Sequence, residues 1–114
     1  MLRNLLLALI LLVISCRRTS DEALDALQRA VLSSNPSYYI ETNQNYIRTL
    51  YTLEELRKAD SSKVVYRTKV GNSIHIFYIE AYRNEHPDTF IIYLTKAGKE
   101  YRIINGSIRG LEVK

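Results

Sequence analysis

The chain has few of the residues from which covalent cross-links and metal centres are made. Its 114 residues include one cysteine and two histidines, His75 and His86. One cysteine cannot form a disulfide within the chain. Two histidines and a single cysteine also fall short of a tetrahedral zinc site unless carboxylates complete it, and the histidine spacing is not a ligand motif. We therefore expect no internal disulfide, no metal site and no cofactor.

Glycine is scarce as well, and the sequence motifs of common enzyme classes are missing. The four glycines fall at expected turns or in the C-terminal tail, so none belongs to a phosphate-binding loop. There is no G-x-S-x-G elbow and no H-E-x-x-H zinc motif. The available carboxylates, such as Glu80 and Glu85, have a simpler role in keeping strands soluble. We predict that the protein is not an enzyme; a hydrolase would require a cleft that brings a histidine beside a serine and a carboxylate.

The charged residues are numerous but are not gathered in one patch. Sixteen basic and twelve acidic residues give a formal net charge of +4. The basic residues are spread along the chain, which is typical of a solvated surface and not of a nucleic-acid-binding patch. A second interpretation is attraction to an anionic membrane surface, because Arg17 and Arg18 are adjacent near the N-terminus. We expect no nucleic acid partner.

An apolar run near the N-terminus ends two residues before the lone cysteine. Residues 5–14 are all apolar, Arg3 precedes them, and Ser15 and Cys16 follow. The run is too short to cross a hydrocarbon core of roughly 30 Å, which needs about twenty helical residues. Its layout is that of a signal peptide. The sequence VISC at positions 13–16 resembles the lipobox of bacterial lipoproteins, although that family more often has Leu where this chain has Val13.

The resemblance implies a location in the cell envelope and a lipid anchor. Residues 1–15 would be a lipoprotein signal peptide, residues 16–20 a lipidated Cys16 and its tether, and residues 21–114 a single domain. Lipoproteins of this kind carry more than one acyl chain, such as palmitate, and are held firmly. Because Arg17 stands where an Asp favours the inner membrane, the resemblance favours the outer membrane, facing the periplasm or the surface. Two alternatives are a short buried helix with an inert cysteine and an uncleaved N-terminal anchor.

The residues after the tether predict a helix. Leu24, Leu27 and Val31 recur with helical spacing and form an apolar stripe. Ser20 is the expected N-cap, and Pro36 follows the end of the pattern. We therefore predict an amphipathic helix over residues 21–32.

The remaining chain is rich in strand-forming residues. The signals at 46–51 conflict: strand-forming residues favour a weak strand, which we predict, although Ile47, Leu50 and Leu53 also have near-helical spacing. A capping box that begins at Thr52 predicts a short helix at 53–59. Turn signals divide the C-terminal half into strands at residues 64–70, 74–82, 89–95 and 100–104. The pair Asn105-Gly106 is a strong turn signal. A fifth strand over residues 108–113 is an alternative to a four-stranded sheet.

The tripeptide His86-Pro87-Asp88 matches one that J-domain cochaperones carry in a loop between two helices. Here the flanking segments are strands, and no basic helix precedes the tripeptide. We interpret residues 84–88 as a hairpin loop, with Pro87 at a turn position and Asp88 closing the turn.

These elements predict an α+β fold. An N-terminal helix would pack on a four- or five-stranded antiparallel meander sheet, with a short second helix before the sheet. The order of elements is similar to that of cystatin-like and nuclear-transport-factor-like folds. No motif supports either family, and a shared fold would not establish a shared function.

Tyrosine is the most distinctive component of the domain. Nine tyrosines accompany two phenylalanines and no tryptophan. This composition is typical of a half-buried sheet or of a binding surface. We predict a small recognition module that binds a protein of the cell envelope, in envelope assembly, inhibition, or immunity or exclusion. Because Tyr and Arg dominate binding hot spots, the candidate binding residues are Tyr78, Tyr82, Arg83, Tyr93 and Arg102.

A second hypothesis is a carrier of lipid or of another small apolar ligand. The concave face of the sheet would then form a pocket that the helix leaves partly unfilled. Its expected lining is Phe77, Ile79, Phe90 and Ile92.

Overall fold

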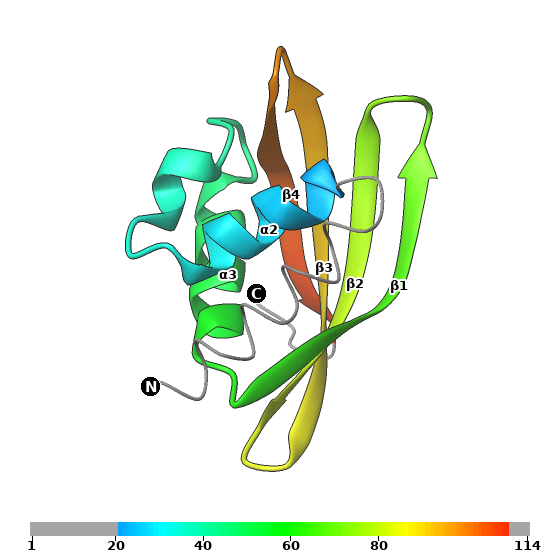
Figure 1. Cartoon of the computed structure of the whole chain (residues 1–114). Helices are drawn as coiled ribbons and strands as arrows, with labels where there is room; N and C mark the ends of the chain where they lie inside the picture. Colours follow the sequence, from blue (N-terminus) through cyan, green and yellow to red (C-terminus); the bar gives the residue numbers. More distant parts are fainter. Residues whose placement is uncertain (1–20, 110–114) are drawn as a thin grey trace, which may run out of the picture.

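The structure is a computed structural model that describes residues 21–109 of the chain. The elements are α2 (Glu22–Leu32), the short 3-10 helix η1 (Pro36–Tyr39), α3 (Tyr46–Arg57), β1 (Ser61–Val70), β2 (Ile74–Arg83), β3 (His86–Ala97) and β4 (Glu100–Arg109). The four strands form one antiparallel sheet in the order β1-β2-β3-β4. Helix α2 crosses one face of the sheet, and α3 packs along β4 (Figure 1). The predicted α+β fold is confirmed, with four strands. The predicted signal peptide, lipobox and tether lie outside the described residues.

Helix α2 matches the helix predicted over residues 21–32. Its N-cap is Asp21, whose side chain accepts a hydrogen bond of 3.2 Å from the backbone N–H of Leu24. This bond satisfies one of the free amides of the first turn. The N-cap therefore lies one residue after the predicted cap, Ser20. Its buried side is made of small residues and one leucine, which allows a close approach to the core: Ala23, Ala26, Leu27 and Ala30.

The predicted strand at 46–51 and separate helix at 53–59 are wrong, because residues Tyr46–Arg57 form a single helix, α3. The aromatic and β-branched residues of this segment suggested a strand, but its buried residues follow helical spacing. Thr49 and Thr52 are both almost fully buried. Their hydroxyls donate to the carbonyls of Asn45 and Arg48, at 2.7 and 2.8 Å, so each buried hydroxyl has a partner within the helix.

The hairpin between β2 and β3 is shorter than predicted. Only Asn84 and Glu85 form the turn, and both have positive φ angles, of 50° and 68°, as in a type I′ turn. The predicted loop at 84–88 is therefore wrong, since residues 86–88 already belong to β3. Pro87 is tolerated there because, among residues 21–109, β4 pairs with β3 only from Thr89 onward, and this end of β3 pairs with β2 alone.

The pair Asn105-Gly106 lies inside β4 and is not a turn. Strand β4 continues to Arg109, so Ile108 belongs to the fourth strand and does not begin a fifth. Residue 106 lies on the helix side of the sheet, where a β-carbon would stand 3.2 Å from the Cβ of Thr52. Glycine is present because α3 approaches the backbone of β4 closely. Such a close approach is a common reason for glycine within a strand.

The described residues share one hydrophobic core between the helices and the sheet. Its fully buried side chains from the sheet include Phe77, Ile92, Leu94 and Ile103, which face Leu27 and Leu53 of the helices. Within residues 21–109, no helix combines the length and apolar character needed to cross a membrane.

Candidate functional site

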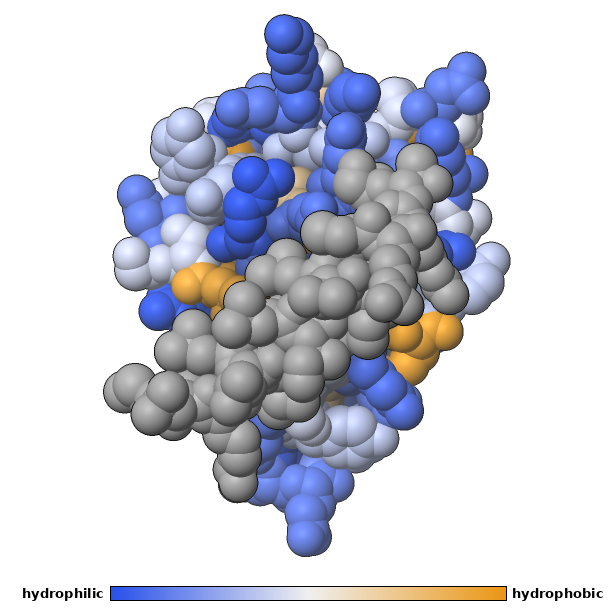
Figure 2. Space-filling model, in the orientation of Figure 1, coloured by the Kyte–Doolittle hydropathy of each residue, from blue (hydrophilic) through white to orange (hydrophobic). Residues whose placement is uncertain are grey.

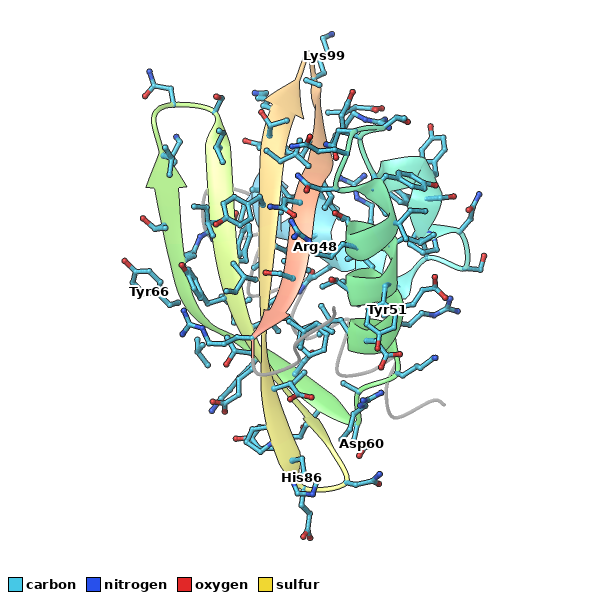
Figure 3. All side chains as sticks on the ribbon, turned by 180° about the vertical axis from the view of Figure 1, so that it is seen from behind. Arg48, Tyr51, Asp60, Tyr66, His86 and Lys99 are labelled. Atoms are coloured by element: carbon cyan, nitrogen blue, oxygen red, sulfur yellow. The ribbon has the colours of Figure 1, made fainter. Side chains whose placement is uncertain are left out.

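The second face of the sheet is covered by neither α2 nor α3. Figure 3 views the molecule from this side, with the four strands in front of α2. Cross-strand pairs place two rows of side chains here. One row is Tyr66, Tyr78 and Ile91, and the other is Thr68, Ile76 and Tyr93. We call these six residues the open face.

The open face is apolar and aromatic. Its side chains are exposed or half-buried, except for Ile76, which its neighbours cover. The rings of Tyr66 and Tyr78 meet edge-on with centroids 5.5 Å apart. Such aromatic pairs stabilise their arrangement by about 0.5–1.5 kcal/mol beyond the area that they bury. Tyr66 is 60% exposed and projects outward from β1 (Figure 3).

The opposite side of the molecule has a different surface. Figure 2 shows the side that carries α2, where the part of the described surface in view is mainly hydrophilic. Three adjacent strands contribute aromatic or branched apolar side chains to the open face instead. The open face is therefore the better candidate for a contact surface.

The structure brings four of the five predicted binding residues to the side of the sheet that carries the open face: Tyr78, Tyr82 and Tyr93, and on β4 Arg102, whose partner Thr95 lies two residues from Tyr93 on β3. Tyr78 and Tyr93 belong to the open face itself. Tyr82 follows in the same alternation, and its hydroxyl donates to the carboxylate of Glu80 at 2.6 Å. This hydrogen bond raises the pKa of Tyr82, because the ionised phenol would lose it and would face a like charge.

The two predicted arginines both hold the fold together. Arg83 points to the helix side, where its Nη1 lies 2.7 Å from Oε1 of Glu55 on α3. Arg102 lies near the outer edge of β4, with its Nε 2.8 Å from Oε2 of Glu41. Its Nη2 also donates to the carbonyl of Ile40, at 3.0 Å. Each guanidinium therefore already has a partner within the domain.

Sequence reasoning did not identify Tyr66 and Ile91 as members of the surface. The register between β1 and β2 shifts between Val64 and Tyr66, which marks a β-bulge. A bulge adds one residue to a strand and reverses the alternation beyond it. Simple alternation along β1 therefore could not place Tyr66 beside Tyr78.

The four residues expected to line an apolar pocket are part of the core. Phe77, Ile79, Phe90 and Ile92 are each at most 4% exposed and belong to the cluster packed against the helices. A ligand on this side of the sheet would have to displace α2 or α3.

The two histidines lie at opposite ends of the β2–β3 pair. His75 is half-buried on the helix side, with its ring 5.3 Å from that of Tyr101. Burial, and then the charges of Lys69 and Arg67, lower the pKa of His75. His86 lies beside the turn at the other end (Figure 3). Within residues 21–109, no group of three or more acidic, histidine or cysteine side chains is arranged to hold a metal ion.

Comparisons of the chain with protein-family models, with curated proteins and with solved structures find no match. Within residues 21–109, the fold and the open face define a small α+β domain with one sheet surface that neither helix covers. Its own residues must carry any functional conclusion.

Proposed function

We propose that the chain is a small protein-recognition module, held at a bacterial membrane by lipid on Cys16, and that the open face contacts a partner protein of the cell envelope. The observation that carries this proposal is the open face itself. Three neighbouring strands present tyrosine and isoleucine side chains that neither helix covers. Tyrosine gives a large apolar contact and a hydroxyl that can pair with a polar group, which explains its frequency at binding hot spots.

The lipid anchor is supported by the lipobox resemblance of residues 13–16. The described chain starts at Asp21, which is bonded to Arg67 of β1. Five residues lead from Cys16 to Asp21, a span of at most about 18 Å. Lipid on Cys16 would therefore keep the domain close to the membrane surface, with β1 near the point of attachment.

Labelling with a radioactive fatty acid tests the anchor. Wild type should incorporate the label and sediment with membranes, whereas Cys16→Ala should lose both properties. Thr19→Ala, which changes the tether and leaves the lipobox intact, is the matched control and should behave as wild type. Label that persists in Cys16→Ala would contradict lipidation at this residue.

Photo-crosslinking in cells tests the contact surface. A photoreactive amino acid is placed at position 78 or 93 of the full chain, and at exposed Glu54 on α3 as a control. We expect one discrete protein adduct from the two open-face positions, absent from position 54. The adduct at position 93 should weaken when Tyr78 is changed to Ala. Equal adducts at all three positions, or none, would refute the open face as the contact surface.

A further inference from the structure

The two edges of the sheet differ in whether their outward backbone groups are paired. The outer edge of β4 is occupied by the segment before α3, because Ile40 forms a parallel bridge with Ile103. The backbone N–H of Glu41 donates to the Ile103 carbonyl at 2.8 Å, and the side-chain amide of Asn43 donates to the Ile104 carbonyl at 3.1 Å. These bonds satisfy backbone groups that would otherwise be open to another strand.

The β1 edge has no such cover among residues 21–109. Strand β1 pairs with β2 on one side, and its ten residues are exposed except for Thr68, which is half-buried. Figures 1 and 3 show β1 as the outermost strand. A long edge strand presents a row of unpaired N–H and C=O groups that can bind an added strand.

The charges of β1 are all positive. Lys63, Arg67 and Lys69 lie on this strand, which contains no acidic residue. Arg67 is bonded to Asp21, but neither Lys63 nor Lys69 forms an ion pair within the described residues. Two cations near opposite ends of an open strand favour an acidic partner.

We propose that the β1 edge binds an extended acidic segment of a partner protein, which adds to the sheet as a fifth strand. The proposal rests on the recognition function proposed above and specifies how the partner binds. Carboxylates of the added strand would face Lys63 at one end and Lys69 at the other. Between them, an aromatic or β-branched side chain would lie beside Tyr66 and extend the open face.

Pairing of β1 with a second copy of itself is disfavoured by the same charges. In an antiparallel dimer, the basic residues of one β1 would face those of the other, and like charges opposite one another destabilise a sheet. An edge with these charges discourages self-association while it remains open to an acidic strand.

Selection from a library of random phage-displayed peptides, with the full chain held in detergent micelles, tests the proposal. We expect the enriched peptides to be acidic, with a carboxylate toward each end and a β-branched or aromatic residue between them. Hydrogen exchange should then show that a selected synthetic peptide slows exchange of β1 amides. In the double variant Lys63→Glu/Lys69→Glu, affinity should fall by about tenfold or more, because two favourable charge pairs become repulsive.

The matched control is Lys96→Glu/Lys99→Glu, which makes the same charge change at exposed positions around the β3–β4 turn. Its affinity should stay within about twofold of wild type. The proposal is overturned if no peptide is enriched, if the enriched peptides are not acidic, or if both double variants lose affinity equally. It is also overturned if β1 amides are protected in a concentration-dependent dimer without peptide. If the peptide slows hydrogen exchange only at Tyr78 and Tyr93, the proposal for the β1 edge is wrong and the proposal for the open face is retained.

Discussion

Gly106 of β4 lies so close to Thr52 of α3 that a β-carbon at position 106 would stand 3.2 Å from the Thr52 Cβ and 3.5 Å from the Thr49 Cα. The first distance is shorter than an ordinary contact, and the second is an ordinary van der Waals contact with the backbone of α3. Thr49 and Thr52 are themselves almost fully buried, so the contact lies deep between helix and sheet. The absence of a side chain at position 106 therefore sets the spacing between α3 and the sheet.

Gly106→Ala should lower the free energy of unfolding by about 1–3 kcal/mol, because the added methyl group forces α3 away from β4. Gly106→Val should cost more, since its two further methyl groups meet the same helix. Urea denaturation monitored by circular dichroism measures both changes. Ser107→Ala, on the other side of the same strand, is the control and should change stability by less than about 0.5 kcal/mol. An unchanged urea midpoint for Gly106→Ala would show that α3 does not pack as tightly as described.

The helices show where sequence reasoning succeeds and where it fails. Helix α2 follows from Leu24, Leu27 and Val31, because an amphipathic helix on a sheet repeats its apolar residues with helical spacing. Helix α3 could not be inferred in the same way, since threonine and tyrosine favour strands locally. Its helical form depends on Thr49 packing against β4, a contact between residues far apart in the chain.

Glu85→Gly should stabilise the protein by about 0.5–1 kcal/mol, because Glu85 has a φ of 68° and only glycine adopts positive φ without steric cost. The change also creates Asn-Gly, which favours the type I′ turn. Thermal unfolding measures the effect. Glu85→Ala removes the same carboxylate and retains the strained backbone, so it should not raise the melting temperature. Equal stabilisation by both variants would assign the gain to charge and not to turn geometry.

Arg83→Ala should destabilise the fold by about 1–3 kcal/mol, because it removes the closest partner of a carboxylate that is mostly buried. The Glu55 side chain is 10% exposed, and its other partner, Lys58 at 3.3 Å, is largely in solvent. Urea denaturation should show that Lys58→Ala costs less than about 0.5 kcal/mol. In a Glu55→Gln background, Arg83→Ala should cost less than in wild type. Additive losses would mean that the two residues do not act as a pair.

The same ion pair shows why an arginine is an unreliable candidate for a binding residue. Sequence composition identifies Tyr and Arg as hot-spot residues, but it does not indicate which of them already have partners within the fold. Arg83 and Arg102 are bonded to Glu55 and Glu41, whereas Tyr78 and Tyr93 lie on the open face. Along β2 the candidate binding residues Tyr78 and Tyr82 share one face and the expected pocket residues Phe77 and Ile79 share the other, because no bulge interrupts the pairing of β2 with β3.

As pH is lowered, the free energy of unfolding should decrease in two separate pH ranges, one due to His75 and the other to Asp21. Burial, with Lys69 and Arg67 nearby, lowers the pKa of His75 below its usual 6.5. Between that lowered value and 6.5 the unfolded chain binds more protons, so the free energy of unfolding decreases as pH falls. The hydrogen bond from Arg67 lowers the pKa of Asp21 below 3.8. The stability that Asp21 contributes is therefore complete above pH 3.8 and is lost as pH falls through the lower value.

Urea midpoints measured at intervals from about pH 7.5 to about pH 3 separate the two groups, because their ordinary pKa values differ by more than two units. His75→Gln should flatten the slope just below pH 6.5 and leave the acidic window in place. His86→Gln changes the same residue type at an exposed position beside the β2–β3 turn and should retain both slopes. If His86→Gln removed the upper slope instead, the pH dependence would belong to the hairpin end of the sheet and not to the half-buried ring of His75.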